Sequence, residues 1–94
     1  MSYSVYIIEC RDKALYVGHT HNLSQRLSHH AKGIGSHHVA QRGFLRLIYS
    51  EHLPDEASAI RREMQIKRWS RAKKKALAQG DTTKLRALSQ SRLT

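Results

Sequence analysis

Five side chains in this sequence could act together on a phosphate ester if the fold brings them to one place. They are two phenols, a guanidinium, an imidazole and a carboxylate, at Tyr6, Tyr16, Arg26, His30 and Glu63. A planar guanidinium offers paired hydrogen bonds to phosphate oxygens, and an imidazole can donate to an oxyanion or transfer a proton. The elements that carry these groups decide whether they meet.

The two tyrosines lie in a predicted β-hairpin. Its strands cover residues 3–10 and 15–20, which are rich in β-branched and aromatic residues and are joined by a short polar segment. A two-residue loop would place Tyr6 and Tyr16 on opposite faces, whereas a three-residue loop places them on one face, with Tyr6 opposite Gly18. In that register the glycine leaves a gap where a substrate backbone could approach beside the phenols. Tyrosines in strands are more often packing residues, and this interpretation stays open.

A helix is predicted over residues 23–33, with Asn22 as its N-cap. At about 100° per residue, the stripe expected to be buried consists of Leu23, Leu27 and Ala31. Arg26 and His30 fall along the edge of that stripe, four residues apart. Both could reach a site at the edge of the sheet, or they could form a solvated flank of the helix.

Glu63 is unusual because it falls on the apolar face of a second predicted helix, over residues 55–69. That face is defined by Ala57, Ala59, Ile60, Met64 and Ile66. Carboxylates are seldom fully buried without a partner. Glu63 is therefore expected either to pair with Arg26 or Lys67, or to bind a hard cation such as magnesium or manganese.

The order of these segments resembles the GIY-YIG nuclease superfamily over about residues 3 to 80. The matching segments are Ser4-Val5-Tyr6, Tyr16-Val17-Gly18, Asn22-Leu23 with Arg26 and His30, and then Glu63. More narrowly, the chain is similar to the small stand-alone bacterial members of the YhbQ-like kind. It departs from the family pattern in having Ser4 for Gly, Val17 for Ile, and His37-His38 where relatives often carry Lys-Tyr.

The resemblance implies hydrolysis of a phosphodiester bond with a single divalent metal, Mg²⁺ or Mn²⁺. By this analogy Tyr6 is the leading candidate for the general base that activates water, with Tyr16 near the attacked phosphate. Glu63 would hold the metal. Arg26 would stabilise the charge of the transition state, and His30 would orient a tyrosine or transfer a proton. A free phenol has a pKa of about 10, so a tyrosine base at neutral pH needs the positive charge that a metal and Arg26 can supply.

The charge of the chain agrees with a nucleic-acid partner. Seventeen Lys and Arg against seven Asp and Glu give a net charge of +10, and residues 61–75 hold eight basic residues with Glu63 as the only acid. Such a stripe binds phosphates strongly, with a marked salt dependence and little sequence preference. DNA is the more favoured substrate, over RNA. The residues expected to contact it are Gly18, Lys32, His37, His38, Arg61, Arg62, Lys67, Arg68, Arg71, Lys73 and Lys74.

Two other functions fit the same charge. One is a non-catalytic DNA- or RNA-binding module on the same scaffold, and the other is an adaptor that docks its basic helices on an acidic protein. Neither needs a carboxylate on a core-facing stripe, so Glu63 favours the enzyme. Trp69 could stack on a base, although packing against a helix is its more usual role.

These elements together predict an α+β domain in which a small three-stranded antiparallel sheet is flanked by helices. The third strand is expected over residues 44–50 and a second basic helix over 70–79, with a mobile loop over 32–43. The nuclease-like domain would cover residues 1–80, and residues 81–94 would form a tail or a short helix.

Cysteine and histidine usage agrees with a reduced, cytoplasmic protein. Cys10 is the only cysteine, which argues against a disulfide framework, and six of the seven histidines lie between His19 and His38 without a spacing typical of zinc sites. No signal peptide or apolar run of membrane-spanning length is present, so we expect no membrane association. No feature indicates an obligate protein partner.

Overall fold

The computed structural model describes residues 2–34 and 37–91. It is an α+β fold in which a three-stranded antiparallel sheet has the order β2-β1-β3. The strands are β1 (Tyr3–Cys10), β2 (Leu15–Thr20) and β3 (Phe44–Leu53). The predicted fold class is confirmed, and β3 extends beyond the predicted end at Ser50.

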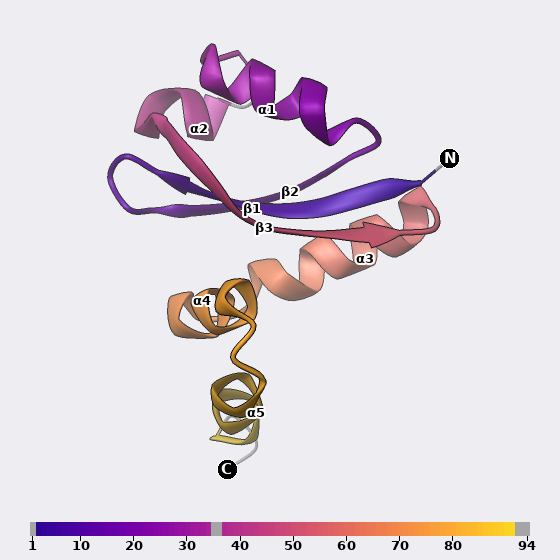
Figure 1. Cartoon of the computed structure of the whole chain (residues 1–94), viewed down its shortest axis with the longest axis vertical. Helices are drawn as coiled ribbons and strands as arrows, with labels where there is room; N and C mark the ends of the chain where they lie inside the picture. Colours follow the sequence, from indigo (N-terminus) through magenta and orange to yellow (C-terminus); the bar gives the residue numbers. More distant parts are fainter. Residues whose placement is uncertain (1, 35–36, 92–94) are drawn as a thin grey trace.

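Helices cover both faces of this sheet (Figure 1). On one face lie α1 (Leu23–Ala31) and α2 (His37–Arg42), and on the other lie α3 (Glu56–Lys67) and α4 (Arg71–Gln79). The last helix, α5 (Thr82–Ser91), packs against α4 and lies away from the sheet. Residues 92–94 of the predicted tail lie outside the described residues. Within the described part of the chain, no helix is both long and apolar enough to cross a membrane.

The central strand β1 serves two hydrophobic cores. Val5 and Ile7 point towards α3, where they pack with a core that includes Ile66. Tyr6 and Ile8 point the other way, towards α1 and α2. Because helices cover the strand on both sides, its side chains from Ser4 onwards are buried without the alternation of a strand that is wet on one face.

The hairpin between β1 and β2 settles where the tyrosines point. The Cys10 amide donates to the Ala14 carbonyl, which leaves a three-residue loop whose last residue, Lys13, has φ 72°. This is the expected geometry of a turn followed by a left-handed residue. Tyr6 therefore pairs with Gly18, and Tyr16 lies on the same face of the sheet as Tyr6. This is the register predicted for a three-residue loop.

Side-chain caps begin three of the helices where the sequence indicated. The Asn22 Oδ1 accepts from the Gln25 amide at the start of α1, and Asp55 and Ser70 cap α3 and α4 in the same way. An N-cap oxygen satisfies one of the amides that the first helical turn leaves unpaired. These caps fix where α1 and α3 start, and so the height of Arg26 and Glu63 along the sheet.

Two predictions about the helices are wrong. The segment predicted as a loop contains α2, which is anchored because Val39 is completely buried against the Tyr6 side of the sheet. In α1 Ala31, predicted in the buried stripe, is exposed, whereas His30, predicted at the edge of the stripe, is the one buried residue of the helix. The helix is rotated so that the imidazole, and not the methyl group, faces the strand carrying Tyr6.

The buried stripe of α3 is narrower than predicted. Ala59 and Ile66 are buried, but Ile60 and Met64 are 41% and 51% exposed, and Ala57 is also exposed. Ala59 and Ile66 are seven residues apart and form a single line along the helix. The sheet has only three strands, so it covers only that line, and Glu63 lies at the margin of the stripe and not at its centre.

Candidate active site

The first part of the site is a buried pair of side chains between β1 and α1. The Tyr6 Oη lies 3.0 Å from the His30 Nε2, and the two residues are 0% and 1% exposed. Their rings meet edge to face, with centroids 5.8 Å apart. The rotation of α1 that buries His30 therefore creates this contact.

Gly18 makes room for the phenols. A Cβ atom at this position would lie 2.6 Å from the Tyr6 Oη and 3.0 Å from Cε2 of Tyr16. Real Cβ atoms essentially never approach other atoms as closely as the first of these distances. Both tyrosines can lie over the edge strand only because no side chain stands there.

Tyr16 extends the cluster towards α2. Its ring is partly exposed, with centroids 5.7 Å from His30 and 5.6 Å from His38. The Arg42 Nε donates to the His38 Nε2 over 3.1 Å, and Arg42 also forms an ion pair with Asp12. Since a guanidinium can only donate, the His38 Nε2 must be unprotonated, and a neutral His38 carries its proton on Nδ1. His38 therefore lies beside the Tyr16 ring, tilted by 31° to it, with a donor available.

Charges from both sides of the sheet act on the Tyr6 phenol. Burial and the neighbouring Tyr16 raise the pKa of Tyr6 to about 12, the Arg26 guanidinium acts to lower it, and the Glu63 carboxylate raises it further. Burial, with help from Arg26 and His29, lowers the pKa of His30, so this imidazole is neutral at neutral pH. Arg26 and Glu63, from helices on opposite faces of the sheet, therefore act on the pKa of this phenol in opposite directions.

His30 has an unusual hydrogen-bond balance. Its Nδ1 is the one buried side-chain nitrogen or oxygen in the described part of the chain that has no partner. A neutral imidazole has one N–H and one lone pair. If Nδ1 is the nitrogen that carries the lone pair, the proton is on Nε2 and is donated to the Tyr6 Oη. This tautomer avoids burying an unpaired donor.

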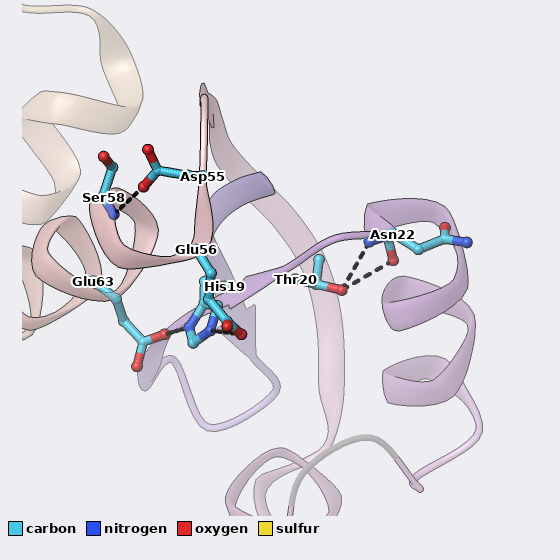
Figure 2. A network of polar contacts seen from close by, with 7 residues as sticks. All are labelled: His19, Thr20, Asn22, Asp55, Glu56, Ser58 and Glu63. Atoms are coloured by element: carbon cyan, nitrogen blue, oxygen red, sulfur yellow. Dashed lines mark hydrogen bonds and ion pairs between the residues drawn. The ribbon is translucent and has the colours of Figure 1, made fainter. Parts of the chain in front are cut away.

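The second part of the site lies on the other face of β2. Figure 2 shows Glu63 of α3 pointing at His19 of β2, and Glu56 reaching the far side of the same ring. The Glu63 Oε1 is 2.6 Å from the His19 Nδ1, and its Oε2 is 2.6 Å from the Lys67 Nζ. Burial alone would raise the pKa of Glu63, but the hydrogen bonds from Lys67 and His19 outweigh it and lower that pKa.

These contacts decide between the partners expected for Glu63. The ion pair with Lys67 is confirmed, whereas Arg26 lies across the sheet on α1. Sequence reasoning missed His19, because nothing local relates a strand residue to a helix residue 44 positions later. The alternation of β2 could have indicated it, since His19 follows Gly18 and must face the side opposite the tyrosines, where α3 lies.

Glu63 fits a divalent cation in the chemistry of its donors. Its side chain is 15% exposed, and both oxygens already attract hydrogen-bond donors. Across residues 2–34 and 37–91, no group of three or more His, Cys, Asp or Glu could hold a metal ion. A cation here would take few protein ligands and keep several waters, as magnesium commonly does.

Four basic residues in or beside α3 and α4 fall into two groups. Arg61 and Arg68 are exposed and, with Trp69, border a shallow pocket of about 360 Å³. Arg62 pairs with Glu51 and lies over the Trp69 ring, and Lys73 is buried with its amine 4.1 Å from that ring's centroid. Trp69 packs against the core. The first group lies on the surface, whereas Arg62 and Lys73 support Trp69.

The remaining predicted contact residues lie at several places on the surface. Lys32 and His37 are exposed near the ends of α1 and α2. Arg71 donates to the Lys13 carbonyl in the hairpin loop. Lys74 is partly buried, and burial lowers its pKa. The structure therefore gathers Tyr6, Tyr16, Arg26, His30 and Glu63 around β2 and leaves the basic residues spread over several elements.

Comparison with known proteins agrees with this arrangement. Residues 2–76 match the family model of the GIY-YIG catalytic domain. The chain belongs to the GIY-YIG family. This membership supports a nuclease-type function and nucleic-acid binding, and GIY-YIG nucleases generally depend on a divalent metal.

Its GIY-YIG relatives include several proteins named UPF0213. One from Natronomonas pharaonis is 36% identical over 83% of this chain and 92% of its own length, and one from Staphylococcus haemolyticus is 39% identical over 74% and 85%. The solution NMR structure of the UPF0213 protein from Bacillus halodurans is 38% identical and covers 84% of each chain with a TM-score of 0.53. The fold shared with that protein confirms the predicted α+β class.

Proposed function

We propose that this GIY-YIG protein hydrolyses phosphodiester bonds of nucleic acid, DNA in preference to RNA, with a divalent cation held by Glu63. The observation that carries the proposal is the pair of phenols over Gly18, with the Tyr6 Oη 3.0 Å from the His30 Nε2 on one side of β2 and the Glu63 carboxylate on the other. A tyrosine that only packs needs neither a bare glycine beside its hydroxyl nor a carboxylate behind the strand. Arg26 also acts to lower the pKa of Tyr6, as a phenol that must release its proton beside a phosphate requires.

The α1 side of the site handles the proton. With a pKa of about 12, only about one Tyr6 in 10⁵ is ionised at pH 7. The His30 Nε2–H and the nearby Arg26 guanidinium stabilise negative charge on the Tyr6 oxygen. Solvent reaches Tyr16 but not Tyr6, so Tyr16 is the tyrosine that contacts the attacking water. In the proposed step the ionised form of Tyr6 takes the proton of the Tyr16 hydroxyl while Tyr16 takes one from the water, so that Tyr6 is the final acceptor.

The Glu63 side of the site sets the charge. The Glu63 carboxylate now raises the pKa of Tyr6, and neutralising it removes that effect. A bound Mg²⁺ or Mn²⁺ supplies positive charge to the phosphate oxygens and to the leaving alkoxide. Arg26 provides paired donors for the remaining phosphate oxygen charge. Exposed basic residues such as Arg61 and Arg68 hold the rest of the nucleic-acid backbone.

A second function is favoured by one observation. Both Glu63 oxygens are already paired, with His19 and Lys67, which is what a purely structural carboxylate would show. A nucleic-acid-binding module on the same scaffold would keep these pairs and the basic surface. It would bind substrate but leave it intact.

A cleavage assay separates the two functions. Labelled duplex, nicked, branched and single-stranded DNA, and matching RNA, are incubated with wild type, Glu63→Gln and Arg26→Ala, each with Mg²⁺, Mn²⁺ or EDTA. Arg86→Ala is the matched control, because it removes an exposed arginine on α5, away from the sheet and the phenols. We expect metal-dependent products from wild type and Arg86→Ala only. Equal binding by all four proteins without products would establish the binding module instead.

A further inference from the structure

His19 has an environment that the proposed chemistry has not used. It pairs with Val5 across the hairpin, faces α3, and is only partly exposed. Its Nδ1 lies 2.6 Å from the Glu63 Oε1, and its Nε2 lies 4.0 Å from the Glu56 Oε2 (Figure 2). The ring is therefore held between two carboxylates, with one nitrogen directed at each.

The two carboxylates have different surroundings. Glu63 is largely shielded and belongs to the site, whereas Glu56 is 59% exposed at the start of α3. In this structure the His19 Nδ1 donates to Glu63, but once a cation displaces that proton, the carboxylate beside the far nitrogen favours the tautomer whose proton is on Nε2, which leaves the Nδ1 lone pair for the cation. Metal-binding histidines are commonly oriented in this way by a carboxylate on the other ring nitrogen.

We infer that His19 is a second protein ligand of the cation held by Glu63, and that the site therefore prefers Mn²⁺ to Mg²⁺. The inference rests on the proposed function in one respect, that Glu63 binds the cation. The proton now shared by the His19 Nδ1 and the Glu63 Oε1 occupies the place that the cation would take.

The distances allow this exchange. Two ligands that each lie about 2.1 Å from a cation and meet at a right angle are about 3.0 Å apart. The present separation of 2.6 Å needs to widen by only a few tenths of an ångström, and both side chains are partly exposed. Lys67 contacts the other oxygen of Glu63, so Oε1 is the oxygen left for the cation.

The mixed ligand pair explains the preference. Magnesium is a hard cation that binds mainly oxygen, whereas an imidazole nitrogen suits later divalent metals better. A carboxylate alone discriminates little between Mg²⁺ and Mn²⁺. Adding one imidazole shifts the balance towards Mn²⁺, with the remaining positions filled by water.

The test uses Mn²⁺ alone as the probe, with the full-length protein. Binding is measured by the decrease of the free Mn²⁺ electron paramagnetic resonance signal, and nitrogen ligation by electron spin echo modulation of the bound ion. The proteins are wild type, His19→Ala, Glu63→Gln and the control His21→Ala, which removes an exposed histidine just beyond β2. Wild type labelled with ¹⁵N-histidine shows whether the ligating nitrogen comes from a histidine, without any substitution that could disturb folding.

We expect histidine nitrogen coupling in wild type and His21→Ala, and its loss in His19→Ala. Mn²⁺ affinity should fall about 10- to 100-fold in His19→Ala, with a much smaller change for Mg²⁺ measured by competition. Bound Mn²⁺ without histidine coupling, but with loss of binding in Glu63→Gln, would overturn the inference and leave the proposed function intact. Mn²⁺ binding that Glu63→Gln does not weaken, or no binding at all, would overturn both.

Discussion

Gly18→Ala should push the side chains of Tyr6 and Tyr16 away from their positions over β2. The added Cβ would lie 2.6 Å from the Tyr6 Oη, and ordinary contact begins at 3.4 Å, so that hydroxyl must retreat by about 0.8 Å. Tyr6 is wholly buried and bonded to His30, so it has no free space in which to move. Overpacking of this kind costs about 1 to 3 kcal/mol of unfolding free energy.

The effect on cleavage should be larger than the effect on folding. A displacement near 1 Å in a positioned group can lower a rate about 100-fold. The assays are urea denaturation and single-turnover cleavage of whichever labelled substrate wild type cuts. Gly33→Ala is the matched control: Gly33 has φ +77° and no neighbouring atom within 4 Å of where a Cβ would stand, so alanine there strains the backbone without touching the site. It should lose stability but keep its cleavage rate.

The opposite result is a Gly18→Ala variant that cleaves within threefold of wild type and loses less than about 0.5 kcal/mol, the range of neutral surface substitutions. It would mean that the positions of the two phenols do not depend on the absence of a side chain at residue 18.

Three further predictions concern charge. Tyr6 binds its proton more tightly in the folded protein, with a pKa of about 12 against 10.0, so its contribution to stability is complete below pH 10 and is lost as the pH rises towards 12. Urea denaturation should therefore show a smaller loss of stability at alkaline pH in Tyr6→Phe than in wild type. Tyr49, whose pKa is also raised to about 12, accounts for the loss that remains. An equal loss in Tyr6→Phe would refute this. Lys67→Met removes the ammonium group from the Glu63 carboxylate, so Mn²⁺ affinity measured by calorimetry should rise several-fold, and a fall would show that Lys67 helps to hold the cation. Arg68→Gln should weaken duplex binding and reduce the slope of log affinity against log salt by about 0.9, and an unchanged slope would remove Arg68 from the interface.

The sequence narrowed the hairpin to two registers, and the structure decides between them. Both strands were visible as β-branched runs, and the loop length then decided whether Tyr6 and Tyr16 share a face. Helix starts were also accessible, since Asn22, Asp55 and Ser70 are side chains that cap locally. These features depend on neighbours in the sequence.

Other features depend on tertiary contacts and could not be predicted. His30 lies at the edge of its helical wheel, and only the rotation of α1 against β1 shows that it is buried against Tyr6. The exposure of Met64 follows from the small width of the sheet. The pairing of His19 with Glu63 joins residues 44 positions apart. The short helix α2 was hidden because its six residues are too few to show a period.

The most direct test of the central claim is a double-mutant cycle on single-turnover cleavage, with wild type, Tyr16→Phe, Glu63→Gln and the double variant. Tyr16 and Glu63 lie on opposite sides of β2, and we propose that they serve one reaction. Groups that act as a unit are strongly non-additive, so the double variant should be no more than a few-fold slower than the slower single variant. Losses that multiply, or single variants as active as wild type, would contradict a shared active site across the edge strand.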